Sequence, residues 1–123
     1  MSEVLTVLLI DDEPDVLITF SEYLDGCGYQ VMTALDGETG LTMFEQSAPD
    51  VVVTDLRMPG LDGFQVIRAI KSRSPHTAVI VLTGTGESHV TEQVTDLGAF
   101  CCLYKPLHNL NDLVVAIELA HGT

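Results

Sequence analysis

The sequence predicts a doubly wound α/β domain, in which a five-stranded parallel sheet lies between two layers of helices. Three observations favour this fold. Five short apolar stretches are rich in β-branched residues, as is typical of strands that are covered on both faces. Longer stretches with apolar residues at helical spacing alternate with them. No hairpin signal joins consecutive strands, so the helices form the crossovers and the strands run parallel.

The strands are expected where the apolar runs are shortest and richest in valine and isoleucine. They cover residues 4–10, 30–34, 51–54, 78–82 and 101–104. Each run is bounded by turn residues or by a helical pattern. The order of these runs therefore gives five strand-then-helix units.

Five helices are expected, one after each strand. Their core-facing residues are Val16, Phe20 and Leu24; Leu41, Phe44 and Ala48; Phe64, Ile67 and Ile70; Val90, Val94 and Leu97; and Leu110, Leu113, Val114 and Ile117. Pro14 suits the first turn of the first helix, and Asp36 suits the N-cap of the second. The expected helix stops are Gly26 or Gly28, residues 72–75, and Gly98.

The length and charge of the chain restrict its function classes. The 123 residues suffice for a single domain with its own core, which we expect to extend over residues 1–123. Eighteen acidic residues face only five basic ones, giving a formal net charge of -13. Such a charge repels nucleic acids and anionic lipids, so we expect neither direct nucleic-acid binding nor membrane binding.

The cysteines and the N-terminus favour a cytoplasmic protein. Three cysteines, of which Cys101 and Cys102 are adjacent, fit neither a disulfide framework nor the spacing of a zinc site. We therefore expect Cys27, Cys101 and Cys102 to be buried, reduced thiols. The N-terminus lacks a basic region and a cleavage site, and no apolar stretch approaches the ~20 residues that span a bilayer.

Polar residues gather where the expected strands end, which is where open parallel sheets bind their ligands. These residues are Asp11, Asp12, Asp55, Thr83 and Lys105. With the strand order 2-1-3-4-5 of a flavodoxin-like fold, the first and third strands are neighbours and the three aspartates converge. A divalent cation and the Lys105 ammonium would balance their charge, and Mg²⁺ suits carboxylate and water ligands.

The same residues could support phosphoryl transfer to a carboxylate. This reaction depends on positioning and on neutralising charge at the phosphoryl oxygens. Asp55 is the candidate nucleophile, because an aspartate can form an acyl phosphate. Mg²⁺, Lys105 and either the Thr83 hydroxyl or a nearby backbone N–H would each take one phosphoryl oxygen.

Four motifs, in this order along the chain, carry a family resemblance. They are "LLIDDEP", "VVVTDLRMPGLDG", "VIVLTG" and "GAFCCLYKP". Together they resemble the receiver domain of two-component response regulators, over residues 4 to about 120. Each motif is weak by itself, but all four at these spacings are highly specific.

The resemblance implies a role for each site residue. Asp55 would be phosphorylated by the phosphohistidine of a sensor histidine kinase or phosphotransfer protein. Asp12 and the backbone carbonyl of Arg57 would bind Mg²⁺ directly together with Asp55, whereas Asp11 would act mainly through water. Thr83 and Lys105 would bind the phosphoryl group. The chain would then catalyse only its own phosphorylation and dephosphorylation, and Thr85 with Arg57 would tune the lifetime of the phosphorylated state.

The resemblance also implies a partner surface, formed by the fourth helix, the fifth strand and the fifth helix. Phosphorylation would shift the packing of these elements and pass a signal to an output domain or a downstream protein, and a phosphorylation-dependent dimer is also open. The fourth helix suits a movable role, because four of its residues are β-branched and glycines precede it.

The chain departs from the family pattern at two positions. The family has an aromatic residue three positions before the lysine, which rotates when the site is phosphorylated, and here that residue is Cys102. Phe100 and Tyr104 lie two residues to either side, on the same face of the strand, and either could substitute. Gly84 stands where the family often has alanine.

Some individual residues could instead have a purely structural role. Asp12 could be only a helix N-cap, and Asp62 with Gly63 fits a turn and cap better than a ligand. We expect the Met58 side chain to be buried in the core under the loop, the Arg57 side chain to lie at the surface, and the four histidines to be exposed to solvent.

Alternative functions share parts of the pattern. A haloacid-dehalogenase-type phosphatase also uses an aspartate nucleophile at a strand end, but it needs an acid two residues later, where this chain has Arg57. A flavodoxin-like cofactor binder needs a phosphate cradle after the first strand, where this chain has carboxylates. A non-phosphorylated pseudo-receiver that only binds partners is the third alternative.

Overall fold

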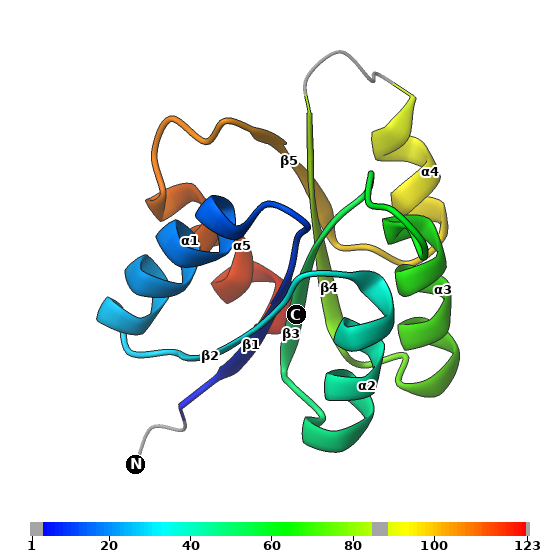
Figure 1. The fold of residues 1–123 in the computed structure, drawn as a ribbon, viewed down its shortest axis with the longest axis horizontal. Helices are drawn as coiled ribbons and strands as arrows, with labels where there is room; N and C mark the ends of the chain where they lie inside the picture. Colours follow the sequence, from blue (N-terminus) through cyan, green and yellow to red (C-terminus); the bar gives the residue numbers. More distant parts are fainter. Residues whose placement is uncertain (1–3, 85–88, 123) are drawn as a thin grey trace.

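A computed structural model of the chain describes residues 4–84 and 89–122, and it contains one sheet of five parallel strands in the order β2-β1-β3-β4-β5 (Figure 1). The strands are β1 (Thr6–Ile10), β2 (Gln30–Ala34), β3 (Val51–Asp55), β4 (Ala78–Gly84) and β5 (Cys101–Lys105). The helices are α1 (Pro14–Gly26), α2 (Gly37–Ser47), α3 (Gly63–Arg73), α4 (Val90–Asp96) and α5 (Asn111–His121). The doubly wound, flavodoxin-like fold and its strand order are therefore confirmed.

Several predicted boundaries were wrong, and most errors concern the carboxyl ends of the strands. Asp55, Thr83 and Lys105 are the last or next-to-last residues of β3, β4 and β5, because backbone pairing with a neighbouring strand continues through them. β1 begins two residues later than expected, where its pairing with β2 starts at Thr6. Asp55, Thr83 and Lys105 therefore belong to the sheet itself, whereas Asp11 and Asp12 follow β1 as expected.

Some residues assigned to helices terminate them instead. These residues are Ala48 and Leu97, which are C-caps, and Leu110, which is an N-cap. Ala48 has a φ of 45°, a left-handed conformation that ends α2. The predicted caps Asp36 and Asp62 are confirmed, since each accepts a hydrogen bond from a backbone N–H in the first turn of its helix.

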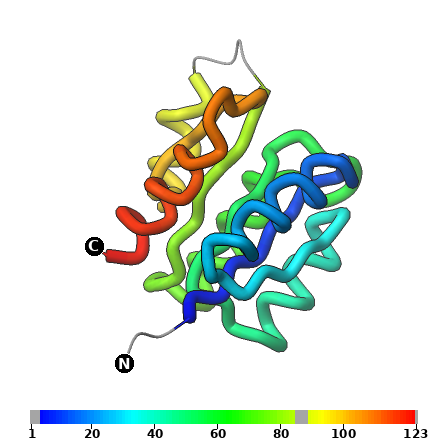
Figure 2. Tube along the Cα trace, turned by 90° about the vertical axis from the view of Figure 1, so that its left-hand side faces the viewer, coloured from blue at the N-terminus to red at the C-terminus, as the bar shows by residue number. Residues whose placement is uncertain are grey.

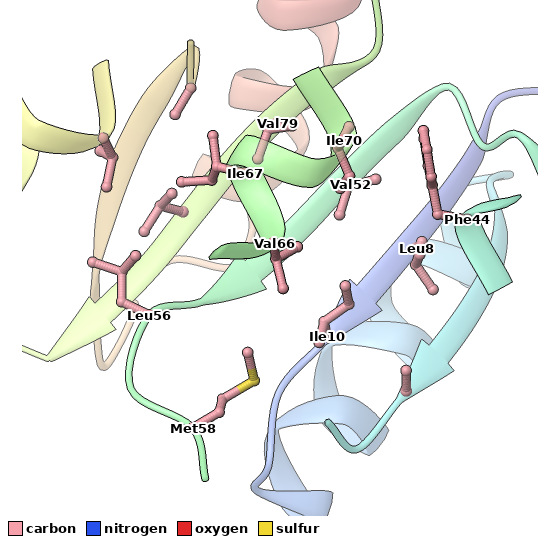
Figure 3. Close-up of a cluster of buried hydrophobic side chains, with 14 of the residues drawn as sticks. Leu8, Ile10, Phe44, Val52, Leu56, Met58, Val66, Ile67, Ile70 and Val79 are labelled. Atoms are coloured by element: carbon pink, nitrogen blue, oxygen red, sulfur yellow. The ribbon is translucent and has the colours of Figure 1, made fainter. Parts of the chain in front are cut away.

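The helices form two layers that bury opposite faces of the sheet. α2, α3 and α4 cover one face, where Val66, Ile67 and Ile70 of α3 pack against strand residues such as Val52 (Figure 3). α1 and α5 cover the other face and lie side by side in front of the sheet in Figure 2. Because both faces are covered, the central strands β1, β3 and β4 are buried almost throughout.

The burial of individual side chains agrees with some predictions and contradicts others. Met58 is buried with the α3-side cluster, as expected, and the four histidines are exposed. The prediction of buried thiols was wrong. Cys27 is exposed in the turn after α1, and Cys101 and Cys102 are half-buried because β5 is an edge strand with a neighbour on one side only. Among the described residues, no helix combines the length and apolarity that crossing a bilayer requires.

Candidate functional site

Three charged side chains meet at the carboxyl end of the sheet, the upper edge in Figure 1. Asp11 directly follows β1, Asp55 ends β3 and Lys105 ends β5. The Lys105 Nζ atom lies 3.0 Å from Asp11 Oδ2 and 3.2 Å from Asp55 Oδ2. The ammonium therefore bridges two buried carboxylates that would otherwise repel each other.

Backbone donors fix the orientation of Asp55. The Leu56 N–H donates to Asp55 Oδ1 at 2.7 Å, and the Arg57 N–H donates to the same oxygen at 3.4 Å. Oδ2 faces Lys105 instead, and the side chain is only 7% exposed. One carboxylate oxygen is thus held by the backbone, and the other faces the shared pocket.

The loop after β3 is fixed close to Asp55. The Gly63 N–H donates to the Leu56 carbonyl at 2.9 Å, and Gly63 approaches so closely that an added Cβ would clash with the Asp55 carbonyl oxygen. Only glycine allows this contact between the start of α3 and the end of β3. The Arg57 side chain is exposed, as predicted, and its guanidinium lies 5.6 Å from the centre of the Phe64 ring.

The pocket changes the protonation of its own members. Burial raises the pKa of the Asp11 carboxyl, and the Glu13 N–H and Lys105, which favour the ionised form, only partly oppose this. Burial acts to lower the pKa of Lys105, but its hydrogen bond to Asp11 and the charges of Asp11 and Asp55 outweigh burial and raise it. Lys105 is therefore firmly cationic, and Asp11 is a carboxylate for which the ionised form is costly in the absence of further positive charge.

Four acidic side chains could hold a cation together. Asp11, Asp12, Glu13 and Asp55 each offer an oxygen, and these oxygens lie within 4.8 Å of one another. Asp12 and Glu13 are exposed, whereas Asp11 and Asp55 are buried. A set of carboxylate oxygens that is open to water on one side suits Mg²⁺, which keeps several of its water ligands.

Sequence reasoning assigned no site role to Glu13. Its Oε1 lies 3.3 Å from the Lys105 Nζ, and its N–H donates to Asp11 Oδ1 at 2.9 Å. The available signal was its position directly after the acidic pair and before Pro14, where the chain turns from β1 into α1. Asp62, by contrast, forms a complete capping box with Gln65 and lies outside the cluster of acids.

Thr83 lies at the predicted edge of the sheet, but inside β4 and not after it. It is fully buried near the end of β4, on the strand that pairs with β3, and one residue beyond the partner of Asp55. Its hydroxyl therefore belongs to the same end of the sheet as the carboxylates. Thr85 and Gly86 lie outside the described residues.

An apolar groove of about 650 Å³ opens beside the pocket, between α1 and the segment after β5. Val16 and Phe20 line it from α1, and Pro106, Leu107 and Leu110 line it from the other side. Glu13 and Lys105 form its edge toward the carboxylates. Sequence reasoning did not predict this groove, because it depends on the spacing between two segments that are far apart in the chain.

Comparison with known proteins identifies the family and agrees with the fold. The family model described as the response regulator receiver domain matches residues 7–118. The chain therefore belongs to the receiver domains of two-component response regulators.

Individual relatives support the same assignment. The chain is 30% identical to sporulation initiation phosphotransferase F of Bacillus subtilis over 100 residues, which cover 81% of each protein. It is 40% identical over 102 residues to a probable transcriptional regulator, ycf27, of Guillardia theta, covering 81% of this chain but 39% of the relative. This chain therefore spans about four tenths of that longer protein.

A solved structure shares the fold closely. A response regulator receiver domain protein from Clostridium thermocellum superposes with a TM-score of 0.91 at 38% identity, covering 97% of this chain and 95% of that one. The likeness extends over the whole sheet and both helix layers.

Proposed function

We propose that the chain is a phosphorylation-controlled switch in which Asp55 accepts a phosphoryl group from the phosphohistidine of a sensor histidine kinase or phosphotransfer protein. The observation that carries this proposal is the bridging of Asp11 and Asp55 by the Lys105 ammonium, at 3.0 and 3.2 Å. A buried carboxylate with one oxygen held by the backbone and the other beside a cation is well placed to act as a nucleophile. We propose that residues 1–123 form one such domain.

In the transfer step, a carboxylate oxygen of Asp55 attacks the phosphorus atom of the donor. A P–O bond forms, and the P–N bond to the donor imidazole breaks with its electron pair passing to the ring nitrogen. The product is an acyl phosphate on Asp55 and a free histidine on the donor. Later attack by water releases inorganic phosphate and restores the carboxylate.

Lys105 and Thr83 would stabilise the transferring group. The Lys105 ammonium already lies beside Asp55 Oδ2 and can move from that oxygen to a phosphoryl oxygen without crossing the pocket. The Thr83 hydroxyl, at the end of the adjacent strand, would donate to a second phosphoryl oxygen. Both contacts form only after the phosphoryl group arrives.

The acidic cluster would hold Mg²⁺, through Asp11, Asp12, Asp55 and the Arg57 backbone carbonyl, with Glu13 as an additional carboxylate. When bound, the ion neutralises negative charge on the incoming phosphoryl oxygens. The raised pKa of Asp11 supports this assignment, because a buried acid that resists ionisation is one that a second cation stabilises. Asp12 and Glu13 remain open to water and could accept an ion from solution.

The partner surfaces follow from the position of the pocket. The apolar groove between α1 and the segment after β5 borders Lys105, so we propose that the phosphodonor protein docks there with its histidine over Asp55. The face of α4, β5 and α5 would contact an output domain or downstream protein, and could also serve a phosphorylation-dependent dimer. Val115 and Leu119 supply exposed apolar area on α5.

The pocket disfavours a phosphatase that turns over small phosphate esters. Such an enzyme would need an acid two residues after the nucleophile, where the chain has Arg57 with an exposed side chain. A pseudo-receiver that binds partners without phosphorylation is the remaining competitor. It differs from our proposal in one measurable property, which is modification of Asp55.

The test is intact mass spectrometry after incubation with acetyl phosphate and Mg²⁺. We expect the wild-type protein to gain one phosphoryl group and Asp55→Asn to gain none. Asp25→Asn, an equivalent change at an exposed position on α1, should be phosphorylated like the wild type. Equal gain in the wild type and Asp55→Asn would refute Asp55 as acceptor, and no gain in either would favour the pseudo-receiver.

A further inference from the structure

The basic residues of this acidic chain are concentrated in one segment. Four of the five lie between residues 57 and 73, on the loop after β3 and on α3. They are Arg57, Arg68, Lys71 and Arg73. The fifth is Lys105, which lies among the pocket carboxylates. The segment contains a single acid, Asp62, so nearly all of the 18 acids lie on the rest of the chain.

A groove of about 730 Å³ lies beside this segment, between the helices α3 and α4 on the outer side of the molecule (Figure 1). Arg68 borders the groove from α3 and Asp96 borders it from α4, and both side chains are exposed. Phe64 and Leu97 also line it, and both pack against the α3-side core cluster. The groove therefore combines two half-buried apolar side chains with opposite charges on its two sides.

The charges on the two sides of the groove do not neutralise each other. Among the residues that the structure describes, neither Arg68 nor Asp96 forms an ion pair, although both border the same space. Arg73, further along α3, instead lies 2.7 Å from Glu45 of α2. The Arg68 guanidinium and the Asp96 carboxylate are thus both available to a second molecule.

Asp96 has an unfavourable position on its helix. It is the last residue of α4, where the unpaired backbone carbonyls give the helix end a partial negative charge. The last turn of α4 has no basic residue, whereas α3 ends with Lys71 and Arg73. The first turn of α4 is held by a hydrogen bond between the Thr91 and Tyr104 hydroxyls at 2.6 Å. A cation that enters the groove therefore stabilises the end of the helix that this bond does not reach.

The two signs of charge restrict what can fill the groove. A uniformly acidic surface would bring its carboxylates against Asp96, and a uniformly basic one would meet Arg68. A complementary surface must itself carry an arginine beside an aspartate. On this chain only the same groove offers that pattern, because the residues outside 57–73 include no lysine or arginine other than Lys105.

We propose that the groove between α3 and α4 is a contact between two copies of this chain, related by a two-fold axis, in which Arg68 of each copy pairs with Asp96 of the other. A two-fold contact uses the same surface on both copies, so the pair forms twice and the assembly closes as a dimer. Phe64 and Leu97 lie at the centre of the contact and exclude water from the pairs. The dimer needs no phosphoryl group on Asp55, so this inference does not rest on the proposed function.

The net charge of the chain does not prevent this contact. Two copies with a formal charge of -13 repel each other, but at physiological ionic strength charges more than about 8 Å apart are largely screened. The charges inside the contact therefore decide whether it forms. The contact also leaves the apolar groove beside Lys105 open, because that groove lies on the α1 and α5 side of the sheet.

Sedimentation velocity of the unphosphorylated full chain tests the dimer at protein concentrations from about 10 µM to 1 mM, which cover weak association. We expect a dimer that dissociates on dilution, because small contacts are weak. Arg68→Asp and Asp96→Arg each place like charges opposite each other at both pairs, so each should raise the dissociation constant by at least about tenfold. The double variant Arg68→Asp/Asp96→Arg exchanges the two charges and should return to within about threefold of wild type.

Three controls separate the groove from other causes. Arg73→Asp on α3 changes the net charge as Arg68→Asp does, and Asp25→Arg near the end of α1 changes it as Asp96→Arg does. Neither residue lines the groove, so both variants should dimerise like the wild type. Asp55→Asn should dimerise as well. A dimer in Asp55→Asn keeps this inference separate from the phosphorylation of Asp55, which is tested by mass spectrometry.

Each other outcome overturns the inference. A wild type that stays monomeric at 1 mM has no such contact, and a dimer that Arg68→Asp and Asp96→Arg leave unchanged uses another surface. A double variant that is folded by circular dichroism but monomeric shows that Arg68 and Asp96 do not pair. Equal weakening by Arg73→Asp and Asp25→Arg assigns the effect to net charge and not to the groove.

Discussion

Helices α3 and α4 cover the same face of the sheet, and each follows a strand that carries a pocket residue, but they are held in different ways (Figure 1). α3 has eleven residues and opens with a complete capping box of Asp62 and Gln65. α4 has seven residues and no side-chain bond at its N-cap. α3 buries Val66, Ile67 and Ile70 fully, whereas α4 buries only two valines, Val90 and Val94.

The difference separates a fixed side of the pocket from an adjustable one. Each fully buried branched side chain contributes about 1.5–3 kcal/mol, and a capping residue contributes about 1 kcal/mol. α3 has more buried branched side chains than α4 and also has a capping residue. It begins in direct contact with the strand end that carries Asp55. The proposed phosphoacceptor, Asp55, is therefore held by the stable helix, whereas the weakly held helix belongs to the face that we propose contacts a partner.

The largest expected effect comes from the core of α3. Ile70→Ala removes a side chain that is fully buried under the sheet, and we expect it to lower the free energy of unfolding by about 3 kcal/mol. The matched control is Ile18→Ala on α1, where the same side chain is 55% exposed and the change should stay within about 0.5 kcal/mol. Urea unfolding measures both. Equal losses at the two positions would show that burial on α3 is not what holds this side of the molecule.

The next effect concerns the contact between α3 and Asp55. Gly63→Ala places a methyl group against the Asp55 carbonyl oxygen and 2.7 Å from the Leu56 Cα, so we expect a loss of about 1–3 kcal/mol and slower phosphorylation. Gly26→Ala at the end of α1 meets no atom within 4 Å and should be neutral or slightly stabilising, with normal phosphorylation. Urea unfolding and the rate of acetyl phosphate labelling test the pair. A Gly63→Ala protein that is phosphorylated at the wild-type rate would contradict a fixed acceptor side.

Sequence reasoning succeeded where a feature depends on short stretches of chain or on the regular geometry of the sheet. Asp36 and Asp62 could be assigned as caps because each bonds to a residue three positions on. Asp11, Asp55 and Lys105 could be brought together because parallel strands end at one edge. Neither step required knowledge of side-chain conformations.

Sequence reasoning failed where the answer depends on which segments pack together in space. The contact between Glu13 and Lys105 joins residues 92 positions apart, and the bond from Tyr104 to Thr91 depends on where a short helix settles. The expected burial of Cys102 failed because an edge strand has one neighbour, which a strand's own composition does not reveal. The choice between Phe100 and Tyr104 likewise depends on their surroundings in space, which the sequence does not give.

A smaller loss of stability is expected when the N-cap of α3 is removed. Asp62→Ala removes the side chain that accepts from the Gln65 N–H at 3.0 Å, and we expect a loss of about 1 kcal/mol. Because Asp62 lies outside the acidic cluster, Mg²⁺-dependent phosphorylation should persist at a normal extent. Asp62→Asn should retain most of the stability, since asparagine is an equally good cap. Loss of phosphorylation in Asp62→Ala with stability intact would instead identify Asp62 as part of the site.

The smallest effect is expected from titrating the Asp36 carboxyl, which caps α2. α2 is the third helix on this face of the sheet, and it shows what one ionised cap contributes to a helix. The Thr39 N–H donates to Asp36 Oδ1 at 2.7 Å, and this bond lowers the pKa of Asp36 below its ordinary value of 3.8. A lowered pKa in the folded state means that the cap stabilises α2 above pH 3.8, and that this contribution disappears as the pH falls through the lowered value. Carboxyl NMR should follow Asp36 titrating below pH 3.8, with the Thr39 amide shift moving in step. Asp36→Asn keeps a cap but cannot ionise, so its Thr39 amide should not respond over this range. An Asp36 that titrates at or above 3.8 would mean that the cap bond is not maintained in solution, and the first turn of α2 would then resemble that of α4.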